Sequence, residues 1–250
     1  MPRAVIFDVD GTLIDSVDLH ALAWHKAFMN FGHSVSIEQA RRQIGKGGDQ
    51  LLPVFLSEAD IRDHGSEMEE WRGNLFKSEY LPLVRPFSGV PELLDRVRRN
   101  GSLVAVASSA KTDELEAYLN IAGIKDLVDT TTSVDDAKHS KPAPDIFLST
   151  LAKAGVQAFE AIVIGDTPYD AEAAVRAAIE PVGFLCGGFL EADLRNSGCT
   201  AVYHGPAALL ASFASSPYLL SALHSLMGIL QSHGIAAWQT SRPASMVSPL

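Results

Sequence analysis

The sequence has few cysteines, no excess of basic residues and no long uncharged apolar segment. Cys186 and Cys199 are its only thiols, and they lack the C-x-x-C spacing of a structural zinc site. We expect both to be reduced thiols. No uncharged apolar run is long enough to span a bilayer, and no basic segment leads into an apolar one at the amino terminus. A cytoplasmic protein without a membrane span is the resulting expectation.

The charge balance limits the partners of the chain. The formal net charge is −10, so the phosphate backbone of a nucleic acid would be repelled, and no nucleic acid is expected as the main partner. Hydrophobic residues make up 47% and charged residues 20% of the sequence, a composition typical of a globular protein. A chain of 250 residues can form one large domain or a core domain that carries a smaller one.

The stretch from Ala4 to Thr12 organises the rest of the prediction. Four apolar residues run into Asp8, Val9, Asp10 and a glycine, the pattern of a strand buried on both faces. In open α/β sheets, ligands gather beyond the carboxyl ends of such strands. Two carboxylates one residue apart need a cation or a shared proton. A plain Asp-x-Asp-Gly turn is the alternative, whereas a calcium loop fails because its later ligand positions are not acidic.

Beyond this motif the pattern predicts two kinds of structure. Residues 15–83 show helical spacing and no convincing strand, which indicates a helical domain inserted into a core formed by residues 1–14 and 84–213. From residue 86 strands and helices alternate, which predicts a doubly wound parallel sheet, the α/β fold class. Strands are expected at 4–7, 103–107, 127–131, 161–164, 182–185 and 201–203, and helices at 90–99, 113–122, 144–154 and 171–178.

The segment 214–250 is set apart by its composition, because Arg242 is its only formally charged side chain. Its first half predicts an apolar terminal helix packed on the core, with a dimer contact or association with a membrane surface as alternatives. Its end, rich in serine and proline without periodicity, is predicted to be disordered.

Further polar residues follow the predicted strands or precede helices. They are Ser108 and Ser109, Lys141, and the pair Asp166 and Asp170. Singly, each has an ordinary explanation as a helix cap, a surface lysine or a turn. In one parallel sheet they converge on the same edge as Asp8. Carboxylates holding Mg²⁺, a hydroxyl and a fixed positive charge are suited to phosphoryl transfer, with one carboxylate as the nucleophile.

These motifs, in this order, resemble the haloacid dehalogenase-like (HAD) hydrolase superfamily, its phosphatase and β-phosphoglucomutase-like group with an α-helical cap. The resemblance covers residues 1–210 and implies a Rossmann-like core with residues 15–83 as the cap. It implies that Asp8 attacks the substrate phosphorus and that Asp10 acts as general acid and base. Lys141 is then expected to offset the repulsion between Asp8 and the phosphoryl group.

The same resemblance implies the binding roles. Phosphoryl oxygens are expected to meet the N–H groups of Val9 and Asp10, the hydroxyl of Ser108 with Ser109 beside it, and Lys141. For Mg²⁺ the expected ligands are Asp8, the backbone carbonyl of Asp10, Asp166, and Asp170 acting through a water or a neighbouring group.

The superfamily contains several chemistries. Dehalogenases and phosphonate hydrolases of the superfamily lack the second aspartate of the first motif. The presence of Asp10 therefore leaves phosphatase and phosphomutase as the activities that fit. The spacing of Asp15, His20 and Trp24 resembles the hinge of β-phosphoglucomutase, but an acid, Asp49, stands where its phosphate-gripping arginine is expected.

A Mg²⁺-dependent phosphatase for a small phosphate monoester, such as a sugar phosphate or a phosphoglycolate-like metabolite, is therefore the primary prediction. A sugar-phosphate mutase is the alternative enzyme. A different kind of hypothesis is a binding module without catalytic activity. The cap residues expected to line the substrate site are His20, Lys46, Gly47 and Lys77.

Overall fold

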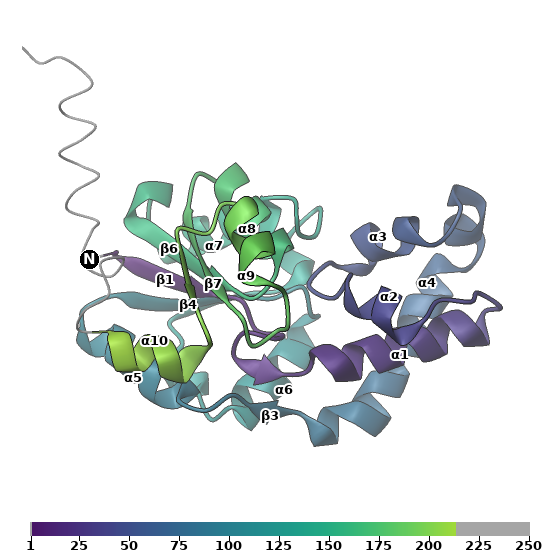
Figure 1. The fold of residues 1–250 in the computed structure, drawn as a ribbon, viewed down its shortest axis with the longest axis horizontal. Helices are drawn as coiled ribbons and strands as arrows, with labels where there is room; N and C mark the ends of the chain where they lie inside the picture. Colours follow the sequence, from purple (N-terminus) through teal and green to yellow (C-terminus); the bar gives the residue numbers. More distant parts are fainter. Residues whose placement is uncertain (1, 214–250) are drawn as a thin grey trace, which may run out of the picture.

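A computed structural model describes residues 2–213 of the chain. A parallel sheet covered by helices lies beside a group of helices formed by the segment predicted as an insertion (Figure 1). Within the described residues, no helix combines the length and the apolar character needed to cross a membrane. The segment 214–250, with its predicted helix and dimer contact, lies outside the described residues.

The core of the fold is a six-stranded sheet in which every neighbouring pair is parallel. In chain order its strands are β1 (Ala4–Phe7), β4 (Leu103–Ala107), β5 (Thr130–Thr132), β6 (Ala161–Gly165), β7 (Glu180–Phe184) and β8 (Ala201–Tyr203). They lie in the order β5-β4-β1-β6-β7-β8. The winding direction therefore reverses between β1 and β6, the point at which doubly wound sheets bind their ligands.

Helices cover both faces of this sheet (Figure 1). The helices of the sheet unit are α5 (Val90–Arg99), α6 (Thr112–Ile121), α7 (Asp145–Ala154), α8 (Pro168–Arg176), α9 (Glu191–Asn196) and α10 (Pro206–Ser212). On β1, Val5 and Phe7 join the apolar cluster of α5, α6 and α10, whereas Ala4 and Ile6 join that of α7 and α8. This burial on both faces explains why β1 is a continuous apolar run.

The inserted segment has an apolar core of its own, built around residues such as Trp24, Phe28 and Met68. Its helices are α1 (Val17–Asn30), α2 (Ile37–Arg41), α3 (Gly48–Leu51) and α4 (Glu58–Leu75). We call residues 16–84 the helical insertion. The two connections that join it to the sheet pair as a short antiparallel ribbon, β2 (Ile14–Asp15) with β3 (Arg85–Pro86).

Short helical turns complete the backbone. They are the 3₁₀ turns η1 (Leu52–Val54), η3 (Leu81–Leu83), η4 (Lys125–Leu127), η5 (Val134–Asp136) and η6 (Ala158–Glu160), and the π-helical turn η2 (Phe76–Tyr80).

The predicted α/β class and doubly wound parallel sheet are confirmed, with differences in the bounds of single elements. The strand expected at 127–131 lies at Thr130–Thr132 because η4 occupies the preceding residues. The helix expected at 171–178 begins at Pro168, where Thr167 and Asp170 form a capping box. Helices α9 and α10 were not predicted, since six or seven residues carry too little periodicity to be recognised.

Candidate active site

Two aspartates extend from the ends of the adjacent central strands. Asp8 follows β1 and Asp166 follows β6, and the N–H of Asp8 donates to the carbonyl of Ile164 across the pair at 2.9 Å. Asp170 lies in the first turn of α8. One carboxylate oxygen of each lies within 4.8 Å of the others, and all three side chains are buried. The topology therefore gathers three acids that the sequence places up to 162 residues apart.

Lys141 supplies the positive charge of this cluster. It precedes α7 and is completely buried. Its ammonium forms an ion pair with Oδ1 of Asp8 and another, at 2.8 Å, with Oδ1 of Asp170. It also donates to the carbonyl of Ala107 at 3.2 Å. Burial by itself would lower the pKa of Lys141, but Asp170 and Asp8 raise it overall, so the lysine remains charged.

One cation does not balance three buried carboxylates. Burial, followed by the charge of Asp170, raises the pKa of Asp8 to about 7, although Lys141 opposes the shift. Burial also raises the pKa of Asp166 well above its usual range, with Asp8 and Asp170 adding to the effect. The cluster is therefore short of positive charge in its ionised form.

The oxygen atoms of Asp166 fit a divalent cation. Its Oδ1 accepts from the hydroxyl of Thr12 at 2.8 Å. Its Oδ2 is buried and has no hydrogen-bond partner among the described residues. A Cβ atom at Gly187 would lie 1.6 Å from this Oδ2, so the glycine leaves the space that the carboxylate needs. An unpartnered carboxylate oxygen beside two further acids is the donor set that Mg²⁺ and similar ions prefer.

Asp10 lies in a different environment from Asp8. Its Oδ1 accepts from the hydroxyl of Ser16 at 2.6 Å and from Nε2 of His20 at 2.9 Å. Burial would raise the pKa of Asp10, but the charge and hydrogen bond of His20, with the hydroxyl of Ser16 and the charge of Arg72, outweigh burial and lower it. Asp10 is thus ionised at neutral pH, and an ionised carboxylate only accepts, so Nε2 of His20 is the donor.

His20 is held from two further sides. Its ring stacks on that of Phe76 with the centroids 3.9 Å apart. The hydroxyl oxygen of Tyr118 lies 3.0 Å from the same Nε2, and this hydroxyl donates to Glu114 at 2.8 Å. A buried chain therefore runs from Glu114 in α6 through Tyr118 and His20 to Asp10. It links the sheet unit to α1 of the helical insertion.

The two serines after β4 are used differently. Ser108 is completely buried, and its Oγ accepts from the N–H of Ala110 at 3.0 Å, which leaves its own hydrogen available to a ligand. Ser109 donates to the carbonyl of Gly45 at 3.2 Å, a contact with the insertion. After β1, the carbonyl of Val9 accepts from the N–H groups of Thr12, Leu13 and Ile14. This tight turn carries Asp10 past the end of the strand.

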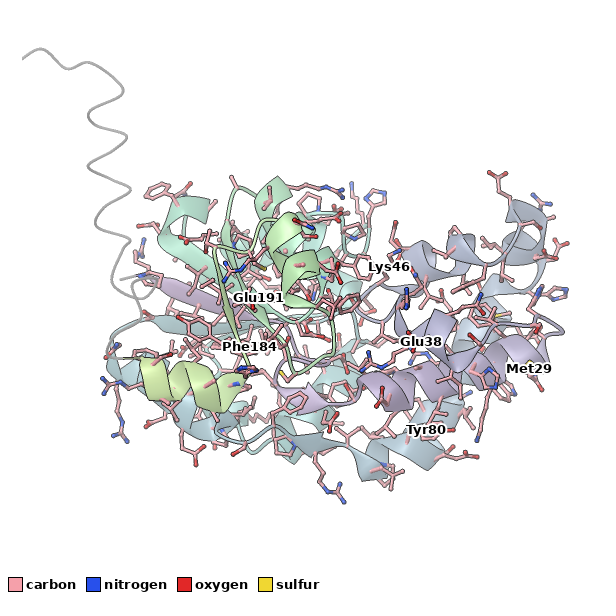
Figure 2. All side chains as sticks on the ribbon, viewed as in Figure 1. Met29, Glu38, Lys46, Tyr80, Phe184 and Glu191 are labelled. Atoms are coloured by element: carbon pink, nitrogen blue, oxygen red, sulfur yellow. The ribbon has the colours of Figure 1, made fainter. Side chains whose placement is uncertain are left out.

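Two adjoining cavities lie between the sheet unit and the insertion. The inner one, of about 30 Å³, is lined by Asp8 and Asp10 together with His20 and Lys46. The outer one, of about 300 Å³, is lined by Gly47 and Lys77 among others. Figure 2 shows Lys46 at this junction. The four predicted cap residues thus face the two cavities.

Two of these cap lysines have partners of their own. Lys77 pairs with Asp113 at 2.6 Å. Lys46 donates to Gln43 at 2.7 Å and lies 4.5 Å from the ring centre of Tyr169. These contacts hold both lysines at the edges of the cavities.

Several residues of the site were missed by sequence reasoning, among them Ser16, which donates to Asp10. Thr12 is part of the first motif, and its hydroxyl donates to Asp166. Its place in that motif is the sequence feature that could have identified it as a site residue. Glu114 and Tyr118 are four residues apart on α6, but nothing local marks their contact with His20. Arg72 lines both cavities, yet it stands in a helix rich in charged residues that is typical of a solvated face.

The chain is similar to known proteins in sequence. A family model described as haloacid dehalogenase-like hydrolase matches residues 5–184. A phosphoglycolate phosphatase of Aquifex aeolicus is 30% identical over 190 residues, which is 74% of this chain and 85% of that protein. The Arabidopsis thaliana protein SUPPRESSOR OF QUENCHING 1, chloroplastic, is 32% identical over 180 residues, 70% of this chain, but the chain covers only 17% of its length.

The fold also matches solved structures. One from Bacteroides vulgatus, provisionally assigned as a beta-phosphoglucomutase, has 25% sequence identity and a TM-score of 0.74. The match covers 89% of this chain and 90% of that one.

Proposed function

The chain belongs to the haloacid dehalogenase-like hydrolase family, and from this premise we propose that it is a Mg²⁺-dependent phosphatase. Its substrate is a small phosphate monoester, and the phosphoryl group is carried transiently by Asp8. The similarity to a phosphoglycolate phosphatase that is 30% identical supports hydrolysis of a phosphorylated metabolite. The observation that carries the proposal is the buried cluster in which Lys141 bridges Asp8 and Asp170 with Asp166 alongside.

The cluster is suited to the transfer step. Asp8, Asp166 and Asp170, the last directly or through a water, would hold Mg²⁺, which would neutralise the phosphoryl oxygens and lower the pKa of Asp8. A carboxylate oxygen of Asp8 attacks the phosphorus while the bond to the ester oxygen breaks. Lys141 limits the repulsion between this carboxylate and the incoming phosphate. The free hydroxyl hydrogen of Ser108 donates to a phosphoryl oxygen.

Asp10 would act first as the general acid and then as the general base. In the first half-reaction it protonates the departing ester oxygen. In the second it takes a proton from the water that attacks the phosphorus, and the bond from phosphorus to Asp8 breaks. Its lowered pKa suits the second half. The first half requires that the approaching phosphate anion raise this pKa, as a like charge does. Ser16 and His20 keep the carboxylate in place for both.

The helical insertion would act as a cap over the phosphoryl site. Besides the apolar packing of Ala23 and Phe76, it contacts the sheet unit through polar groups. Asp49 accepts from the N–H of Ser140 at 3.1 Å, and Tyr169 donates to the carbonyl of Arg42 at 2.7 Å. A few such bonds are weak enough to break when substrate enters and product leaves.

A sugar-phosphate mutase is the second candidate, and the contact between His20 and Asp10 at 2.9 Å is the observation in its favour. A mutase would need another cation in place of the missing arginine, and Lys46 is the nearest lysine in the sequence. The contacts of Lys46 with Gln43 and Tyr169 count against it in that role. A coupled assay separates the two: faster formation of glucose 6-phosphate from β-glucose 1-phosphate with a bisphosphate primer than release of phosphate would favour the mutase.

The proposal is tested by turnover of p-nitrophenyl phosphate with and without Mg²⁺. We expect release of p-nitrophenol by the wild type only with the metal, and none by Asp8→Asn, whose amide keeps the size of the side chain but is not a nucleophile. Equal rates for the two proteins would refute the mechanism.

A further inference from the structure

Arg72, in the last turn of α4, carries a positive charge that forms no ion pair with any acid in the described part of the chain. Its guanidinium carbon lies 5.1 Å from the ring centre of Trp24 and 5.9 Å from that of Phe76. Its Nε is buried without a hydrogen-bond partner, and no ion pair joins it to any residue between 2 and 213. The other arginines in that range either bond an oxygen atom or are exposed. Aromatic rings alone therefore position this half-buried charge.

Arg72 faces the site from α4 of the helical insertion. It lines the inner cavity together with Asp8 and Asp10, and it also lines the outer cavity. It is close enough to Asp10 for its charge to lower the pKa of that carboxyl group. A phosphate ester whose phosphorus meets Asp8 would extend its other end toward the wall that Arg72 forms.

The other charged residues that line the outer cavity do not form ion pairs with Arg72. Its acids are Asp49, Glu69, Glu70 and Glu114, and its other cations are Lys77, Lys111 and Lys138. Glu69, one turn earlier on α4, forms no ion pair with Arg72, and burial raises the pKa of Glu69 although the charge of Arg72 opposes the shift. Glu114 already accepts from Tyr118, and Lys77 is paired with Asp113.

We propose that Arg72 binds a second anionic group of the substrate, so that the site selects phosphate esters that carry a carboxylate or a second phosphate at the other end. This inference rests on the proposed phosphatase function. A guanidinium presents a fork of N–H donors that matches either anion with two hydrogen bonds. Its orientation on Trp24 is fixed before binding, so little conformational entropy is lost when the anion arrives.

The test compares substrates that differ only at that end. One pair is 2-phosphoglycolate and 2-hydroxyethyl phosphate, and the other is glucose 1,6-bisphosphate and glucose 1-phosphate. The readout is the ratio of kcat/KM within each pair, measured with Mg²⁺ for the wild type, Arg72→Met and Arg72→Lys. Arg62→Met is the matched control, because Arg62 lies on the same helix but is exposed.

We expect Arg72→Met to lower the ratio by about tenfold or more in one pair, Arg72→Lys to restore part of it, and Arg62→Met to keep the wild-type ratio. A loss in the first pair identifies a carboxylate, and a loss in the second identifies a phosphate. Ratios that Arg72→Met leaves unchanged in both pairs would overturn the inference even if hydrolysis is rapid.

Binding separates this inference from the proposed function. The same four compounds are titrated calorimetrically into Asp8→Asn, with and without Arg72→Met. If the compounds with a second anionic group bind more tightly than their partners and Arg72→Met removes the difference, the inference stands, even where the wild type hydrolyses none of them and the phosphatase proposal fails. If binding does not depend on Arg72, the inference is wrong.

Discussion

The buried carboxylates predict that the metal-free protein loses stability as the pH rises. The pKa of Asp8 is about 7 in the folded protein against an ordinary value of 3.8, so between these values the folded state holds a proton that the unfolded state has released. Each pH unit in that window then costs about 1.4 kcal/mol of unfolding free energy. The cost levels off above pH 7, which gives a loss of about 3 kcal/mol from pH 5 to pH 8.

The assay is urea unfolding in EDTA at several pH values, followed by circular dichroism. Asp8→Asn is the control, because it removes the titrating group and leaves the other groups that ionise in this range. Its stability should fall with pH less steeply than that of the wild type. Millimolar Mg²⁺ should flatten the wild-type curve, since a bound cation favours the ionised carboxylates. Parallel curves for the two proteins in EDTA would refute the reasoning.

Two further substitutions test the surroundings of the cluster. Tyr118→Phe removes the hydroxyl between His20 and Glu114, so we expect a loss of about 1–3 kcal/mol in unfolding free energy and a fall of about tenfold in kcat. Tyr80→Phe is the control. If both variants have the kcat of the wild type, the hydrogen bonds from Glu114 through Tyr118 to His20 do not contribute to catalysis. Gly187→Ala places a Cβ 1.6 Å from Oδ2 of Asp166, so the Mg²⁺ concentration for half-maximal activity should rise about tenfold or more. Gly73→Ala, with no atom within 4 Å of its Cβ, should keep the wild-type requirement, and equal requirements in both variants would contradict the role of Asp166.

The sheet and the acids at its edge could be predicted from the sequence for one physical reason. A strand buried on both faces must be apolar throughout, so β1 and β6 are visible as short runs, and an acid directly after such a run has to lie at the sheet edge. Asp8 and Asp166 follow this rule. For Lys141 the sequence alone offered only a lysine before a helix. Its inward orientation came from the family resemblance, because no local pattern distinguishes a buried lysine from an exposed one.

The contacts that were missed share a different feature. Tyr118 and His20 are 98 residues apart, and their hydrogen bond joins a helix of the sheet unit to a helix of the insertion. Neither residue has a neighbour in the sequence that would reveal the other. Arg72 was missed for a related reason. Its significance lies in the absence of an ion-pair partner among residues 2–213, and a sequence shows many acids nearby without showing which are within reach.

The site divides its tasks between the two parts of the fold. Asp8 and Asp166 are fixed by hydrogen-bonded strands, so their separation does not depend on the insertion. Asp10 is different, because His20 of α1 holds its carboxylate, and Arg72 of α4 faces the same cavity. A displaced insertion would leave the nucleophile and the metal ligands in place but would misplace the proton-transfer group and the proposed anion contact. Metal binding should therefore survive changes at the junction that proton transfer and substrate selection do not tolerate.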